Sequence, residues 1–324
     1  MSGAAITHDA GFAELVAPFR RELLAHCYRM TGSLADAEDA LQECMVRSWR
    51  GLAQFEGRSS LRTWLYRVAT NTCLTLIGDR RARSLPHLEL PSGATGDVPL
   101  DHEPRWLEPF PDRLIEDDPD RRPDALYSRR EAIRLAFVAA LQRLPARQRA
   151  TLILRDVVAL SAEETAEALE LSVAACNSLL QRARDAIASE APAPRAPIDR
   201  ATEAGLLARY VEAWERGDAH GLIALLRADV IASMPPSLLW VSGPQAVIDC
   251  MVELVWSGGE IRLVPYVAND APGYAIYQRR DGVMTLSAIS IVDLRPDGVA
   301  AIHSFLTMDP VGFGARYRLA PVLE

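Results

Sequence analysis

Arginine, aromatic and amide side chains are interleaved in one short stretch of the N-terminal third of the chain. The stretch contains Arg58, Arg62, Trp64, Tyr66, Arg67 and Asn71. Arginines bind phosphates and aromatic rings hold unstacked bases, so this mixture suits a site for single-stranded nucleic acid. The alternative is an ordinary helical core, in which Trp64 and Tyr66 only pack and the arginines form a solvated face. The residue types of this stretch leave both interpretations open.

Two amphipathic helices are predicted to position these side chains. The second is expected to begin at Ser59 or Ser60, because either serine is a suitable N-cap, and to turn Leu61 and Leu65 inward. The first has an apolar stripe beside a mostly acidic rim. Its stripe contains Ala37, Ala40, Leu41, Cys44, Met45 and Trp49, and its rim contains Asp36, Asp39, Gln42, Glu43 and Arg47.

The segments DAEDALQE and FEGRSSLRTWLYRVATNTC resemble regions 2.2 to 2.4 of the extracytoplasmic-function sigma factors of bacterial RNA polymerase. The resemblance implies that the acidic rim contacts core RNA polymerase and that the second helix holds the opened −10 element of promoter DNA. The polymerase contacts it implies are Asp36, Asp39, Gln42, Glu43 and Trp49. The −10 contacts it implies are Arg58, Arg62, Trp64, Arg67 and Asn71.

A helix-turn-helix is predicted between residues 161 and 188. Ser161 and Glu164 have the spacing of a capping box, and Ser172 is a suitable cap for the following helix. This segment resembles region 4.2 of the same sigma factors, except that Glu170 stands where the turn usually has glycine, which predicts a left-handed backbone there. The implied readers of the −35 element are Ser172, Ala174, Asn177, Ser178, Gln181 and Arg182, with Arg184 available for a phosphate.

An acidic, proline-containing linker, residues 86–123, separates a first helical domain at 1–85 from a second at 124–190. Residues 86–124 hold 11 acidic and 4 basic residues. The resemblance places this linker in the polymerase, near the RNA exit path. Trp106 and Phe110 are large aromatic residues for a tether, and we expect them to dock on a neighbouring surface in an interdomain contact.

Beyond a proline linker at residues 191–199, the chain changes to an α+β pattern over residues 200–324. Helical segments come first, and four strand-like segments follow, with a tight turn at Pro296 to Gly298. This order resembles the SnoaL-like cone fold. The predicted architecture is therefore multidomain: two all-α sigma domains, a region 2 bundle and a region 4 helix-turn-helix, followed by an α+β SnoaL-like domain acting as a regulator in cis.

An isomerase or hydrolase of the cone fold, tethered to DNA by a helix-turn-helix, is the alternative function. Enzymes of this fold need a buried carboxylate base with hydrogen-bond donors. The polar candidates are Asp270 and Asp293, both near turns, and His303, whose alternation with apolar neighbours allows it to point inward. Solvated carboxylates and a lone core histidine are the commoner finding, so we expect no catalytic residues, cofactor or metal. A small ligand in the cone stays open.

Composition limits the remaining possibilities. The net charge is −8, but residues 1–85 hold 11 basic and 9 acidic residues, so the acidity lies outside the predicted −10 reader. Five widely spaced cysteines indicate reduced thiols. No apolar run is long enough to span a membrane, and we expect a cytoplasmic protein whose partners are core polymerase and promoter DNA. Whether a built-in regulator makes a separate anti-sigma factor dispensable stays open.

Overall fold

The computed structural model describes residues 11–78, 82–90, 92–93, 106–115, 126–190 and 198–323. The chain divides into two compact units, a helical unit of residues 1–83 and 112–192 and a sheet unit of residues 84–111 and 193–324. The two predicted helical domains thus share one unit. The linker between them is divided, because its residues up to Pro111 belong to the sheet unit.

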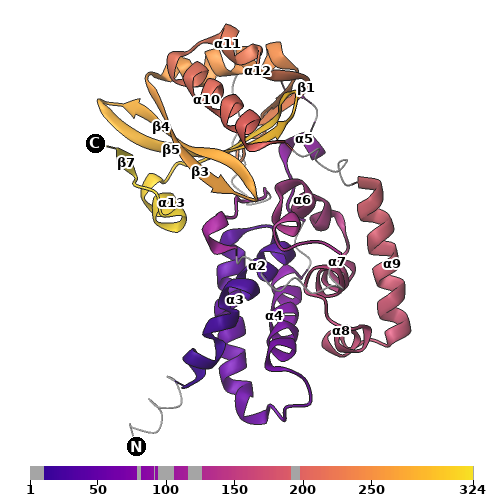
Figure 1. The fold of residues 1–324 in the computed structure, drawn as a ribbon. Coiled ribbons are helices and arrows are strands. Elements are labelled where there is room, and N and C mark those ends of the chain that lie inside the picture. Colours follow the sequence, from indigo (N-terminus) through magenta and orange to yellow (C-terminus); the bar gives the residue numbers. More distant parts are fainter. Residues whose placement is uncertain are drawn as a thin grey trace, which may run out of the picture. The chain divides into compact units, whose positions relative to one another are not determined.

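The helical unit begins with a helical segment at residues 11–16, and short 3-10 and π-helical turns separate its main helices (Figure 1). The main helices are α2 (Arg20–Thr31), α3 (Leu34–Gly51), α4 (Leu61–Ile77), α6 (Leu135–Arg143), α7 (Ala146–Leu152), α8 (Ala162–Leu169) and α9 (Val173–Glu190). The short turns are η1 (Ala17–Phe19), η2 (Leu52–Gln54), η3 (Asp112–Leu114), η4 (Glu131–Ile133) and η5 (Ile153–Val157).

Local sequence explains where α2, α3 and α4 begin and end. α2 ends at Gly32, whose φ of 72° is left-handed and suits glycine. The Ser33 side chain accepts the Asp36 N–H at 3.1 Å and caps α3, and the Ser60 side chain accepts the Thr63 N–H at 3.0 Å and caps α4. The predicted stripe of α3 is buried except for Trp49, which is 43% exposed.

Two buried arginines join α2 to the helices of the second half of the unit. Arg29 of α2 donates to the carbonyls of Ala132 at 3.2 Å and Arg129 at 2.9 Å. Arg149 of α7 is 3% exposed and donates to the Met30 carbonyl of α2 and to the carbonyls of residues 141, 142 and 144 at the end of α6. Burial lowers the pKa of both arginines to about 10, so they remain charged at neutral pH and need these acceptors.

The helix-turn-helix is formed by α8 and α9 as predicted. The capping box is present, with Ser161 and Glu164 each accepting a backbone N–H of the other. Glu170 follows α8 with φ 55°, the left-handed conformation that the sequence predicts. On α9, Cys176 and Leu180 are buried while Val173 is 38% exposed.

The sheet unit combines helices with one mixed sheet of strand order β2-β1-β6-β5-β4-β3, with β7 paired to β5. Its helices are α5 (Pro86–Glu89), α10 (Arg200–Arg216), α11 (Ala219–Ile223), α12 (Pro244–Cys250) and α13 (Pro310–Tyr317), with turns η6 (Met251–Val255) and η7 (Trp256–Gly258). Its strands are β1 (Leu226–Ser233), β2 (Trp240–Ser242), β3 (Ile261–Ala268), β4 (Ala271–Arg280), β5 (Val283–Arg295), β6 (Gly298–Leu306) and β7 (Val322–Leu323). This confirms the predicted α+β cone.

The antiparallel strands β3 to β6 follow the predicted segments, and β5 turns into β6 between Arg295 and Gly298. The strands β1 and β2 were not predicted. β1 pairs in parallel with β6, about 70 residues later in the chain, and its register shifts between Leu226 and Ile231. Leu226, Ala228, Val230 and Ala232 alternate with the polar residues Arg227 and Asp229, so a strand signal is present in this short segment although it was not used.

The two faces of the sheet are covered by different elements. Tyr210 and Trp214 of α10 pack with Ile302 and other inward residues in the main core cluster, and Figure 1 shows α10, α11 and α12 together on that side. Successive residues of a strand point to opposite faces, so His303 lies on the other face and not in the cone interior. There it contacts the Ser233 hydroxyl at 2.8 Å and stacks on His87 of α5.

Replacing Glu170 tests the cost of the turn between α8 and α9. Glycine adopts φ 55° without the side-chain clash that alanine suffers. We therefore expect Glu170→Gly to have an unfolding free energy about 1 kcal/mol higher than Glu170→Ala, because both variants lose the carboxylate and the strain on alanine outweighs the greater chain entropy of unfolded glycine. Urea unfolding followed by circular dichroism measures the difference. A Glu170→Gly variant that is less stable than Glu170→Ala would show that the turn carries no strain.

Candidate functional site

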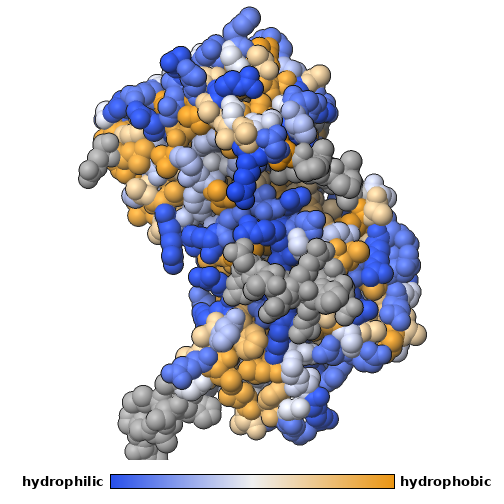
Figure 2. All heavy atoms as spheres, viewed as in Figure 1, coloured by the Kyte–Doolittle hydropathy of each residue, from blue (hydrophilic) through white to orange (hydrophobic). Residues whose placement is uncertain are grey.

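The predicted polymerase-contacting residues lie on the outer face of α3. Asp39, Gln42 and Glu43 are exposed, and the Glu43 carboxylate accepts a hydrogen bond from Arg47 at 2.7 Å. Asp36 is partly buried and pairs with Arg83 at 2.8 Å. Trp49 is exposed, and Figure 2 shows hydrophobic residues at the surface near the connection between α3 and α4. The face therefore combines acceptors with an apolar residue, as a protein-binding surface requires.

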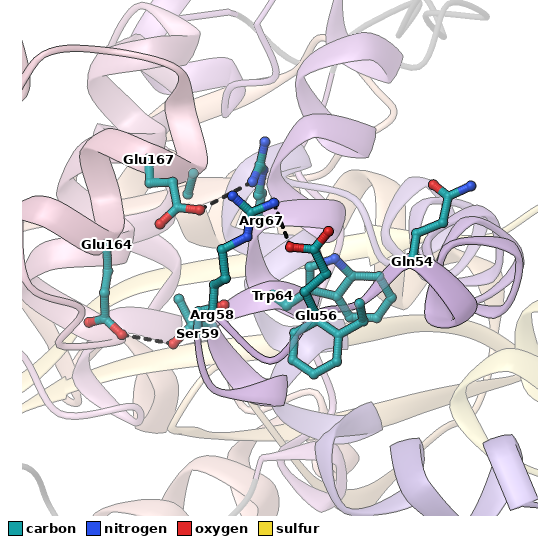
Figure 3. Close-up of a pocket in the computed structure, with 11 residues that line it drawn as sticks. Gln54, Glu56, Arg58, Ser59, Trp64, Arg67, Glu164 and Glu167 are labelled. Carbon is teal, nitrogen blue, oxygen red and sulfur yellow. Dashed lines mark hydrogen bonds and ion pairs between the residues drawn. The ribbon is translucent and has the colours of Figure 1, made fainter.

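The connection between α3 and α4 carries the first predicted −10 contacts. Arg58 is 81% exposed and pairs with Glu56 at 2.8 Å. The rings of Phe55 and Trp64 lie 5.2 Å apart. A cavity of about 300 Å³ opens beside them, lined also by Arg67 of α4 and by Glu164 and Glu167 of α8 (Figure 3).

Arg62, another predicted −10 contact, is engaged inside the unit. Its guanidinium binds the Glu22 carboxylate of α2, with the Nη2 atom 3.0 Å away, and lies 4.8 Å from the centre of the Tyr66 ring. The Tyr66 hydroxyl donates to the same carboxylate at 3.1 Å. Burial by itself would lower the pKa of Arg62, but Tyr66 and Glu22 more than offset it and raise that pKa. Arg62 therefore holds α4 to α2.

Arg67 and Asn71 face α8. Arg67 pairs with Glu167 at 3.4 Å and with Glu170 at 3.8 Å, and the Asn71 amide donates to the Ala168 carbonyl at 3.5 Å. One turn earlier on α4, the Thr63 hydroxyl donates to Glu164 at 2.9 Å. The sequence analysis did not find these partners, because they lie about 100 residues away and their carboxylates resemble an ordinary solvated helix face.

The predicted −35 contacts line one exposed side of α9 and its cap. The Ser172 hydroxyl accepts the Ala175 N–H at 3.2 Å and caps the helix. Gln181 donates to Asp185 at 2.9 Å. Exposed along the same helix are Ala174, Asn177, Ser178, Gln181 and Arg182. Arg184, expected to reach a phosphate, instead binds the buried carboxylate of Asp156 through two hydrogen bonds of 2.9 and 2.7 Å.

Trp106 and Phe110 are buried in the sheet unit. The Trp106 indole donates to the Pro236 carbonyl at 3.2 Å. Phe110 exchanges two hydrogen bonds with Asn269: its N–H donates to the amide oxygen, and its carbonyl accepts the Asn269 N–H, each at 2.8 Å. The linker therefore forms part of this unit over residues 106–111.

The sheet unit shows no grouping of its candidate catalytic residues. Asp293 pairs with Arg295 at 3.3 Å, Asp270 lies in the β3–β4 turn, and His303 faces the opposite side of the sheet from the main core. Burial, with a smaller contribution from His87, lowers the pKa of His303 to about 3, so it is neutral at pH 7. In the described ranges no cluster of His, Cys, Asp and Glu could hold a metal ion.

None of the helices in the described part of the chain is both long and apolar enough to cross a membrane. The described cysteines, Cys27, Cys44, Cys73, Cys176 and Cys250, are buried free thiols. Burial raises the pKa of Cys250 to about 11, which keeps it protonated and unreactive.

Comparison with known proteins identifies both helical regions. Residues 15–83 match the model of Sigma-70 region 2, and residues 134–187 match that of Sigma-70 region 4. Over 302 residues the chain is 45% identical to the ECF RNA polymerase sigma factor SigG of Mycobacterium tuberculosis, a match that covers 91% of this chain and 81% of the relative. It is 29% identical over 243 residues to SigJ of the same species, covering 73% of this chain and 70% of SigJ.

The crystal structure of M. tuberculosis SigJ superposes with a TM-score of 0.59 at 24% identity, covering 94% of this chain and 100% of that one. This agreement supports a shared fold across both units. The alternative of a DNA-tethered isomerase or hydrolase is not supported, because the sigma regions match and the candidate catalytic residues do not converge. The chain belongs to the family of ECF RNA polymerase sigma factors, which bind core RNA polymerase and promoter DNA to initiate transcription and are not enzymes.

Proposed function

We propose that this sigma factor divides its contacts among three helices. The exposed face of α3 binds core polymerase, α4 and the loop before it hold the opened −10 strand, and α9 reads the −35 element as duplex. The observation that supports this division best is the exposed polar row on α9, because amide, hydroxyl and guanidinium groups at Asn177, Ser178 and Arg182 match the hydrogen-bonding edges of bases in the major groove. Action with RNA polymerase places the protein in the cytoplasm.

On α4, the side chains available for DNA are fewer than the sequence suggests. Arg62 is occupied by Glu22, so its proposed role is to hold the helix in place. Arg58 and Trp64 flank the cavity beside the α3–α4 connection, where an unstacked base finds a ring and a cation. Arg67 and Asn71 continue the same surface by one and two turns.

We infer that the sheet unit regulates initiation in cis by holding the linker. Hydrogen bonds from Trp106 and Phe110 fix the linker to this unit, and the Trp240 indole adds one to the Leu90 carbonyl at 2.8 Å. The resemblance to sigma factors implies that the linker threads through the polymerase during initiation. The linker cannot occupy both places, so binding to the sheet unit opposes assembly. Such regulation needs no separate anti-sigma factor.

A small ligand bound inside the cone could shift the equilibrium between linker binding to the sheet unit and assembly with the polymerase. The Tyr210 hydroxyl and the Trp214 indole N–H are both buried inside the cone, and the side chains of Trp214 and Ser290 interact with the Tyr210 hydroxyl. An oxygen-bearing ligand bound beside these groups would add a hydrogen bond to them and stabilise the cone.

Reversing the charge at Asp39 tests the polymerase contact. Asp39→Arg should weaken holoenzyme assembly at least about fivefold, because like charges at an interface are strongly unfavourable. Glu212→Arg on α10 is the matched control, since it reverses an exposed charge in the sheet unit and should leave assembly unchanged. Binding is measured by fluorescence anisotropy with core enzyme. Parent-like assembly by Asp39→Arg would show that α3 is misassigned.

Separate substitutions test the two DNA contacts. In holoenzyme, Asn71→Ala should reduce permanganate-detected opening at the −10 element while duplex binding at −35 is retained. Gln181→Ala should instead relax the preference at one −35 base pair by about 1–3 kcal/mol, because a base contact is lost. Undiminished strand opening by Asn71→Ala would contradict the proposed role of α4.

Loosening the linker tests regulation in cis. Trp106→Ala with Phe110→Ala should speed amide hydrogen exchange at residues 106–111 and raise run-off transcription by about 5- to 150-fold, the range expected for 1–3 kcal/mol of coupling. Leu88→Ala is the control, because Leu88 is in the linker but 41% exposed. Unchanged transcription, in this double variant and after removal of residues 198–324, would rule out a regulator in cis.

A further inference from the structure

α8 presents a row of carboxylates to α4 within the helical unit. Glu164 and Glu167 are three residues apart and lie on one side of the helix, and Glu170 follows directly after its last residue. Their partners Thr63 and Arg67 are four residues apart on α4 and also share one side, which Asn71 continues. Figure 3 shows Glu164 and Glu167 directed from α8 toward the α4 side chains. An acidic face of α8 therefore contacts a face of α4 that carries hydrogen-bond donors.

Glu164 is held in place by the start of its own helix. One carboxylate oxygen accepts the Ser161 N–H at 2.8 Å as part of the capping box, and the other accepts the Thr63 hydroxyl at 2.9 Å. The orientation of this carboxylate is therefore fixed before α4 packs against it.

Glu170 adds a third carboxylate to the same face, although its backbone conformation is unfavourable for any residue other than glycine. It occupies the left-handed residue after α8, where glycine carries no strain, and its side chain lies 3.8 Å from Arg67. The sequence has glutamate where this turn usually has glycine. The structure gives a reason for it, because glycine at this position would supply no carboxylate to Arg67.

The α4 positions that α8 covers are those assigned above to the opened −10 strand. A carboxylate and a phosphate offer the same charge and the same acceptor oxygens to a guanidinium. We propose that the acidic face of α8 is an internal stand-in for DNA, which occupies the −10-reading face of α4 in the free protein and must be displaced by the promoter strand. This inference rests on the proposed function of α4 and describes how that surface is regulated.

The contact is weak enough to be displaced. The side chains of Arg67, Glu167 and Glu170 are 39%, 62% and 76% exposed. An ion pair at such an exposed site changes an equilibrium constant by about fivefold or less. A DNA strand that contacts α4 through several phosphates and a stacked base binds more strongly than this ion pair. A single phosphate contact does not. The stand-in therefore lowers binding of DNA to the free factor without preventing initiation by holoenzyme.

Glu167→Gln tests the proposal in the full chain, with Glu170→Gln added as a second step. Glu163→Gln is the matched control, because Glu163 is an exposed carboxylate on the same helix whose interactions are with its own helix start. The probe is a fluorescein-labelled, mixed-sequence single strand of about twelve nucleotides, within the usual site size. Its affinity is measured by anisotropy at one fixed salt concentration.

We expect Glu167→Gln to tighten binding of the strand by about two- to fivefold and the double variant to tighten it further, while Glu163→Gln stays within about 1.5-fold of the parent. Equal tightening by Glu163→Gln would indicate a general charge effect and overturn the proposal, as would parent-like affinity of the double variant.

Arg67→Ala and Asn71→Ala in the double-variant background separate this proposal from the one on which it rests. If neither substitution weakens binding of the strand, α4 is not the DNA surface and the proposed function fails. If both weaken it while Glu167→Gln has no effect in the parent, the surface is assigned correctly and only the stand-in is wrong. Circular dichroism melting confirms that each variant is folded.

Discussion

The helical unit depends on one buried carboxylate. Glu22 of α2 is 6% exposed and accepts hydrogen bonds from Arg62 and Tyr66 of α4 and from Arg129, which precedes α6. An unpaired charge in this place would cost several kcal/mol, and removing a partner from a buried ion pair typically costs about 3–5 kcal/mol. The carboxylate thus ties sigma region 2 to the segment that leads into region 4.

This constraint bears on the DNA-binding surface proposed for α4. Since Arg62 pairs with Glu22, the proposed surface consists of Arg58 and Trp64 at one end of α4 and of Arg67 and Asn71 farther along. In the free protein the latter two are met by α8. In the proposed assignment, stability and promoter reading therefore depend on different arginines of the same helix, and the packing that completes the unit also covers part of the proposed DNA surface.

The sheet unit has a comparable division between its two faces. One face packs on α10 to α12 around Tyr210 and Trp214, and the other carries α5 with His87 against His303. Burial lowers the pKa of His87 to about 4, so this histidine pair is uncharged at neutral pH and stacks without repulsion. The linker residues Trp106 and Phe110 are bound by the Pro236 carbonyl and by Asn269.

The sequence by itself determined the elements whose signals are local. Helical periodicity predicted α3, and periodicity with a serine cap predicted α4. The Ser161 and Glu164 spacing predicted the start of α8, and alternation with a turn at Pro296 to Gly298 predicted the late hairpins. Only the tertiary structure decided which residues pair when the two partners lie far apart in the sequence. Arg62, a predicted DNA contact, pairs with Glu22 of α2, and β1 pairs with β2 and, about 70 residues later in the chain, with β6. Charge pairing and parallel pairing join residues far apart in the chain, and no local pattern records them.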